Sequence, residues 1–171
     1  MLDKYKFLVP LMIACAVVGT SVPSHAEKPL GKFGVWEAFS EGSKNNRICY
    51  IATKPTKARG NYKKRGKVYT MVTHRPAKNS ANVVSVEAGY NYKEDSEAEI
   101  IIGKQTFKLF TSGTTAFAYD AKTDHALVKA MIKGAEMMVK GFSSRGTKTT
   151  DTYSLKGFSA SYKSINVACK V

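Results

Sequence analysis

The chain has 171 residues, with 27 Lys or Arg against 13 Asp or Glu, and its formal net charge is +14. This length suits one domain of ordinary size with a real core, and the sequence holds no repeats, low-complexity tracts or domain linkers. So strong a positive charge favours anionic partners.

The first 26 residues show the order of features found in secretory signal peptides. Two lysines precede an almost wholly apolar run over residues 7–22, and small residues stand at the two positions before the boundary that a signal peptidase reads. We therefore predict a signal peptide at residues 1–26 and a single exported domain, without a transmembrane span, at residues 27–171. Lipoprotein processing at Cys15 is the alternative.

The exported domain keeps two of the three cysteines, Cys49 and Cys169. In an oxidising compartment an even pair predicts one disulfide, which would tie the C-terminal segment to a strand near the N-terminus. Zinc binding is the rival use, but two distant cysteines without a matching His pair lack zinc spacing. We predict no metal site and no cofactor.

Short strand patterns alternate with turn signals along the rest of the chain. The clearest alternation runs from residue 82 to 92, where Val84, Val86 and Ala88 share one face. A short tail is expected at residues 27–30 and a long loop or splayed hairpin at residues 54–66. Strands are predicted at residues 33–39, 47–53, 67–75, 82–92, 98–102, 105–110, 115–119, 136–142 and 147–155, and helices at 125–133 and 160–168.

This pattern of short strands and two short helices predicts an all-β fold. Its form is a mainly antiparallel β-sandwich decorated by the two helices, and a closed β-barrel is the alternative.

The sequence offers little for catalysis. His74 and His125 lie in no recognisable nucleophile motif, and we expect both at the surface. We therefore predict that the protein is not an enzyme. A hydrolase that uses carboxylates is the less favoured alternative, and the candidate cluster, more simply interpreted as a solvated face, comprises Glu94, Asp95, Glu97 and Glu99.

The segment from Lys54 to Lys67 holds seven basic residues and no acidic one. Lys as a point charge and Arg as a planar fork can both hold phosphate or sulfate groups. The expected partners are an anionic envelope lipid, lipopolysaccharide or a host polyanion, whereas nucleic acid is not expected outside the cytoplasm. A merely solubilising loop is the alternative. The candidate anion-binding residues are Lys57, Arg59, Lys63, Lys64, Arg65 and Lys67.

The order of several short motifs resembles the invasion associated locus B family of Gram-negative bacteria. The resemblance covers essentially all of residues 27–171, and it departs from the family pattern at Val35, where members commonly have Asp. The motifs are Phe33-Gly34-x-Trp36, Arg47-Ile48-Cys49-Tyr50, Met71-Val72-Thr73-x-Arg75-Pro76, Ala126-Leu127-Val128-Lys129-Ala130-Met131, Tyr153-Ser154-Leu155-x-Gly157-Phe158 and the terminal Cys169.

The resemblance implies an exported, envelope-associated and non-enzymatic protein with a β-sandwich-like fold, and in some pathogens a link to host-cell invasion. It supplies no catalytic residues. We expect a binding protein of the periplasm, with outer-membrane association or the cell surface as further locations, that takes part in invasion or envelope maintenance. The alternative is a structural subunit of an envelope complex, held to a protein partner by exposed Tyr and Phe.

Overall fold

The computed structural model describes residues 27–43 and 46–171, so the predicted signal peptide and Cys15 lie outside the described residues. The described chain forms eleven strands, two α-helices and a short 3-10 helix, η1. In chain order the elements are β1 (Lys28–Phe33), β2 (Trp36–Glu41), β3 (Ile48–Thr53), β4 (Lys57–Gly60), β5 (Tyr69–Arg75), η1 (Pro76–Lys78), β6 (Ser80–Glu87), β7 (Glu97–Ile102), β8 (Gln105–Ser112), β9 (Thr115–Ala118), α1 (Ala121–Lys133), β10 (Glu136–Phe142), β11 (Lys148–Ser154) and α2 (Phe158–Cys169).

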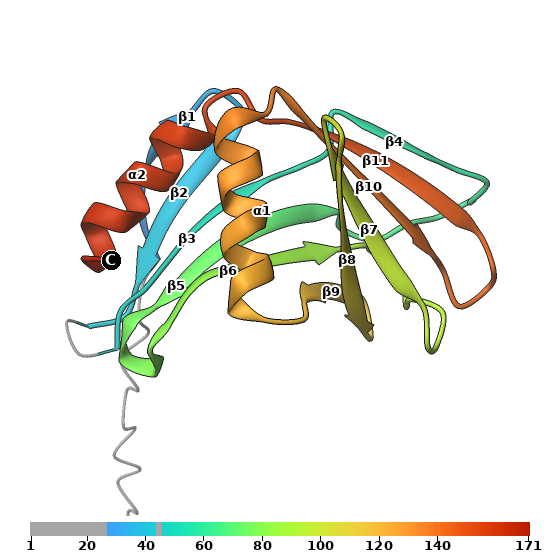
Figure 1. Ribbon diagram of the computed structural model, residues 1–171, viewed down its shortest axis with the longest axis horizontal. Helices are drawn as coiled ribbons and strands as arrows, with labels where there is room; N and C mark the ends of the chain where they lie inside the picture. The colour runs from blue at the N-terminus through green and yellow to red at the C-terminus, as the bar shows by residue number, and fades with distance from the viewer. Residues whose placement is uncertain (1–26, 44–45) are drawn as a thin grey trace, which may run out of the picture.

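All eleven strands belong to one antiparallel sheet, ordered β1-β2-β3-β5-β6-β9-β8-β7-β10-β11-β4. Figure 1 shows the sheet curling, with both helices packed in front of it. The predicted all-β, mainly antiparallel fold with two short helices is confirmed. The sheet keeps two edges, at β1 and β4, so it does not close into the alternative barrel.

Alternating side chains give the sheet an inner and an outer face. On β2, β3, β5 and β6, Ala38, Ile51, Val72 and Val84 form one cross-strand row, and all four are fully buried. This is the inner face, against which the helices pack. Side chains one position along the strands point to the outer face, and Phe39 is an example that remains partly exposed.

Two strands lie where the sequence predicted none. The expected tail forms β1, and the predicted strand at residues 33–39 is instead split by a turn at Gly34, whose φ is +61°. Glycine suits this turn because a Cβ there would lie 2.5 Å from the carbonyl oxygen of Lys156. β4 lies within the predicted loop of residues 54–66, and the chain crosses to the far edge of the sheet to pair it with β11.

Helix α1 begins four residues before the predicted start because Asp120 caps it. The Asp120 carboxylate accepts a hydrogen bond from the backbone N–H of Thr123 at 2.7 Å, which satisfies one of the unpaired donors of the first turn. Leu127, Val128 and Met131 are buried, and α1 contacts β6, β8 and β9.

Helix α2 covers the other part of the inner face, over β1, β2, β3 and β5. Phe158 and Ile165 are fully buried, and the Phe158 ring meets the Trp36 ring edge to face at 5.0 Å between centroids. Among the described residues, neither helix has the length and apolar character needed to cross a membrane.

Candidate functional site

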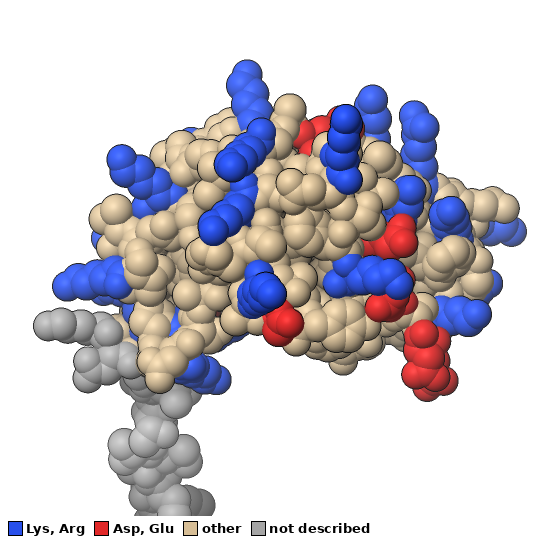
Figure 2. All heavy atoms as spheres, in the orientation of Figure 1, with Lys and Arg blue, Asp and Glu red and all other residues tan. Residues whose placement is uncertain are grey.

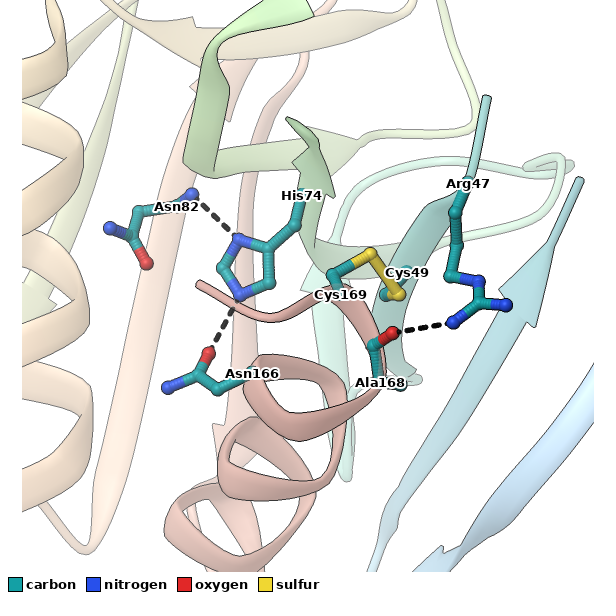
Figure 3. Close-up of a disulfide and its surroundings, with 7 residues drawn as sticks. All are labelled: Arg47, Cys49, His74, Asn82, Asn166, Ala168 and Cys169. Atoms are coloured by element: carbon teal, nitrogen blue, oxygen red, sulfur yellow. Dashed lines mark hydrogen bonds between the residues drawn. A yellow bond between two sulfur atoms is a disulfide. The ribbon is translucent and has the colours of Figure 1, made fainter. Parts of the chain in front are cut away.

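The first predicted site is the cysteine pair, and the disulfide is confirmed. Cys49 on β3 and Cys169 at the end of α2 are bonded, with 6.0 Å between their Cα atoms, and both are buried. Figure 3 shows Arg47 beside the bond, where its Nη1 donates to the carbonyl oxygen of Ala168 at 3.0 Å. The bond fastens the last turn of α2 to a central strand of the first half of the sheet.

His74 lies next to this disulfide, and its expected surface position is wrong: the residue is fully buried. Its Nδ1 accepts the backbone N–H of Asn82 at 3.0 Å, so Nε2 carries the proton and donates to the Asn166 side chain at 2.8 Å (Figure 3). Burial lowers the pKa of His74, and the hydrogen bond with Asn166 opposes that effect only in part. The imidazole of His74 is therefore neutral, and its two nitrogens connect β5 to β6 and to α2.

Within the described residues, the hydrogen-bond partners of the His74 ring are a backbone N–H and an amide oxygen, and neither is a carboxylate. Glu97 is engaged by Lys108 at 2.8 Å and by the hydroxyl of Tyr119 at 2.9 Å, and these contacts lower its pKa. Its neighbours Glu94 and Asp95 are exposed. Over residues 27–43 and 46–171, no three or more His, Cys, Asp or Glu side chains are grouped so that they could hold a metal ion.

His125 is exposed on α1, as predicted, while the preceding Asp124 turns inward. The Asp124 carboxylate accepts the backbone N–H of Val84 at 2.8 Å. β9 pairs with β6 only at residues 85–87, so the Asp124 carboxylate takes the place of a strand partner for the backbone N–H of Val84. Burial raises the pKa of Asp124 to about 6, because the hydrogen bond from Val84 offsets the desolvation only partly, and Asp120 adds to the rise.

The predicted anion-binding residues do not form one surface. Lys57 and Arg59 are exposed on the edge strand β4, where they lie opposite Thr152 and Thr150 of β11. Charged side chains at such an edge also protect it from pairing with another chain. Lys63, Lys64 and Lys67 are exposed in the connection from β4 to β5. Figure 2 shows basic side chains spread over the helix-bearing face, without a single dense patch.

Arg65 points inward, unlike the exposed lysines of the same segment. Its two terminal nitrogens bind both carboxylate oxygens of Asp151 at 2.7 and 2.6 Å, and the two side chains are only 5% and 3% exposed. Its Nε donates to the carbonyl oxygen of Ala88 at 2.6 Å. The guanidinium also lies over the rings of Tyr62 and Tyr90, at 5.4 and 4.9 Å from their centroids.

This ion pair explains why the loop around Arg65 is held in place. Burial by itself would lower the pKa of Arg65, but the hydrogen bonds and charge of Asp151 outweigh it and raise the pKa. The guanidinium therefore stays charged and paired, and the interaction anchors the loop to β11. Sequence reasoning missed this because Asp151 lies 86 residues away in the chain.

The anchored loop forms one wall of a cleft of about 510 Å³, called here the basic cleft. The turn between β10 and β11 forms another wall and brings in Arg145, an exposed cation that the sequence analysis did not identify. Backbone bonds from Ser144 N–H to Asn91 O and from Gly66 N–H to Gly89 O, both 2.8 Å, join the walls. The lining contains no carboxylate and comprises Asn61, Tyr62, Lys63, Lys64, Arg65, Tyr90, Asn91, Ser143, Ser144, Arg145, Thr147 and Thr149.

Comparison with known protein families agrees with the resemblance found in the sequence. A family model described as invasion associated locus B (IalB) protein matches residues 36–166. The chain belongs to this family. No curated protein and no solved structure matches the chain.

Most of the motifs that carry the family resemblance meet at one place in the fold, whereas Ala126–Met131 lies on α1, over β6, β8 and β9. The Trp36 indole N–H donates to the carbonyl oxygen of Ser154 at 3.0 Å, and the Trp36 ring packs on Phe158. A Cβ on Gly157 would lie 1.9 Å from the carbonyl oxygen of Phe33, so this close approach of two motifs requires glycine. Together with the Cys49–Cys169 bond, these contacts form the C-terminal seam between α2 and the first strands. The seam is a structural feature, and the basic cleft lies outside it.

Proposed function

We propose that this IalB family member is an exported, envelope-associated binding protein, not an enzyme, and that it holds anionic groups of its partner at the basic cleft. The observation that carries the proposal is the placement of Lys63, Lys64 and Arg145 around a cleft whose lining has no carboxylate. All three are exposed, and none has an ion-pair partner in the described part of the chain. Arg65 serves by fixing the loop that presents the two lysines.

The chemistry of the cleft favours phosphate or sulfate groups. Lys and Arg attract them as charges, while Asn61, Asn91 and Ser144 add amide and hydroxyl donors along the walls. Anionic lipid head groups, lipopolysaccharide and host polyanions all present such groups, and each matches the strongly positive net charge. Export is supported by the N-terminal sequence and is consistent with a disulfide, which persists in oxidising compartments.

The test compares two triple charge reversals that change the net charge equally. The first is Lys63→Glu, Lys64→Glu and Arg145→Glu in the basic cleft. The second, on the exposed face of α1, is Lys122→Glu, Lys129→Glu and Lys133→Glu. Binding is measured to vesicles of anionic phospholipid, to lipopolysaccharide and to a sulfated polysaccharide, at several salt concentrations.

We expect the cleft variant to lose at least roughly tenfold in affinity for one of these probes, since each basic residue near an anionic surface contributes about 1 kcal/mol. The α1 variant should lose much less. Equal losses in both variants would show that binding follows net charge alone, and no loss in the cleft variant would remove the cleft from the function.

A further inference from the structure

The outer face of the sheet carries a second concavity, which shares no lining residue with the basic cleft. It is a groove of about 750 Å³ over β2, β3 and β5, on the opposite side of these strands from α2. We call it the outer groove. Its floor is formed by Ala52 and Met71, which lie opposite each other on β3 and β5. Met is a flexible, polarizable side chain that adapts to varied apolar ligands.

The strand register arranges the groove as three successive rows. Thr53 pairs with Thr70, so Lys54 and Tyr69 lie side by side in the first row. The second row holds the apolar pair Ala52 and Met71, with Glu37 of β2 on the other side of Ala52, and the third row holds Tyr50. One end of the groove therefore presents an ammonium and a hydroxyl group. Toward the other end, the β3 and β5 side chains that line it are apolar and then aromatic.

The aromatic end continues beyond the groove. The ring of Phe39 on β2 stacks on Tyr50 with 5.3 Å between centroids and 28° between the ring planes. Both rings are partly exposed on the outer face. They extend the apolar strip over which a hydrocarbon chain can lie.

The cationic end has unused binding capacity. Neither the ammonium of Lys54 nor the hydroxyl of Tyr69 has a hydrogen-bond or ion-pair partner in the described part of the chain. The acidic residue of the groove, Glu37, is engaged by Lys32 at 3.1 Å. The wall next to Lys54 is Val35, whose carbonyl oxygen accepts the Thr53 hydroxyl at 2.7 Å and whose side chain is 39% exposed.

We propose that the outer groove binds a medium-chain fatty acid, with its carboxylate at Lys54 and Tyr69 and its hydrocarbon chain over Ala52, Met71 and Tyr50. The charge of the Lys54 end matches a carboxylate, and the apolar rows match a saturated chain. Residues 50 and 54 are about 13 Å apart along a strand that rises about 3.3 Å per residue, which accommodates about ten methylene groups. Dodecanoate is therefore the chain length that fits.

The experiment is calorimetric titration of the purified protein with dodecanoate below its micelle concentration. We expect one binding site, with affinity falling roughly fourfold for every two methylenes removed, because the open groove covers about half of each group. Val35→Asp places a carboxylate beside Lys54 and should lower the affinity roughly tenfold or more. Lys54→Gln removes an exposed ion pair and should lower it roughly threefold to fivefold.

The matched control is Val167→Asp on α2, the same substitution at a position that is 71% exposed on the other side of the sheet. It should bind dodecanoate as the unmodified chain does, and so should the triple variant of the basic cleft. The proposal is overturned if dodecanoate does not bind, if Val35→Asp binds it normally, or if methyl dodecanoate binds equally well. Preferential binding of a lysophospholipid over dodecanoate would also overturn it.

Discussion

The C-terminal seam and the basic cleft both bring together residues that are far apart in the sequence, but they do so by different means. In the seam, a disulfide, a buried imidazole and interlocked aromatic rings hold α2 against the strands. In the basic cleft, one buried ion pair, Arg65 with Asp151, anchors a loop whose remaining cations stay exposed. Most of the family motifs gather at the seam, while the candidate ligand contacts lie on the loop and on the β10–β11 turn.

The comparison separates residues that hold the fold together from residues that stay exposed and available to a partner. Cations adjacent in sequence, such as Lys64 and Arg65, take opposite roles because one side chain faces solvent and its neighbour faces the interior. A run of basic residues is thus divided by burial, and only its exposed members are available to a ligand. Variants that break each region should reveal the division.

The largest expected effect comes from removing the disulfide of the seam. Because the bond closes a loop with a sequence separation of 120, the double variant Cys49→Ala, Cys169→Ala should lose about 5 kcal/mol of unfolding free energy in the chain-entropy model. Urea unfolding monitored by circular dichroism measures the loss. Reduction of the unmodified protein is the control and should shift the midpoint similarly; a change below about 1 kcal/mol would contradict the role of the bond.

The next effect concerns the anchor of the basic cleft. Asp151→Asn leaves the Arg65 guanidinium buried without its counter-charge, which should cost about 3 to 5 kcal/mol. The double variant Arg65→Met, Asp151→Leu removes both charges and should recover most of this loss. Urea unfolding measures both variants. Equal unfolding free energies for the single and double variants would contradict the role of the Arg65–Asp151 ion pair in anchoring the loop to β11.

A smaller, pH-dependent effect is expected at Asp124. Its folded-state pKa of about 6 exceeds the ordinary value of 3.8, so between these values the native state holds a proton that the unfolded state releases. Stability due to this group is thus greatest at low pH and falls as the pH rises toward about 6. Asp124→Asn should be more stable than the parent by about 1 to 3 kcal/mol at about pH 7.5, and the difference should vanish only below about pH 3, where the group is protonated in both states. A difference independent of pH would contradict the assignment.

The smallest effect on stability is expected from the exposed cations of the cleft. The variant with Lys63→Glu, Lys64→Glu and Arg145→Glu should unfold within about 0.5 kcal/mol per substitution of the parent, since surface charges away from buried contacts contribute little. The same protein should show the binding defect described above. Thermal unfolding measures the stability of this variant. A large loss of stability would show that Lys63, Lys64 and Arg145 have a structural role, as Arg65 has.

Local patterns were sufficient to predict much of this fold. The alternation at Val84, Val86 and Ala88 predicted one buried face, and the structure buries all three, although β6 ends at Glu87 and not at the predicted residue 92. The gap between the strands predicted at residues 98–102 and 105–110 matches the turn of the β7–β8 hairpin, where the φ of Gly103 is +59°. Both signals are local, because a strand's face and a turn's backbone geometry depend on adjacent residues.

The features that sequence reasoning missed depend on distant partners. β1 contains Pro29 and Gly31, which weaken a strand pattern, and it is stabilised by pairing with β2. The burial of His74 follows from α2, whose Asn166 lies 92 residues away. Arg145 enters the basic cleft only because the β10–β11 turn folds beside Asn91. None of these contacts leaves a periodic signal in the sequence.

The attachment of α2 also sets the order in which this chain can fold during its synthesis. Strands β2 and β3 appear early, yet Trp36 and Ile51 have no cover for their inner face until Phe158 and the rest of α2 arrive. Cys49 likewise remains a thiol until its partner, with a sequence separation of 120, has been synthesised. Such long-range closure makes folding slow and leaves apolar surface open to chaperones during synthesis. The last turn of α2, held by the Cys49–Cys169 bond, thus completes the packing of the inner face.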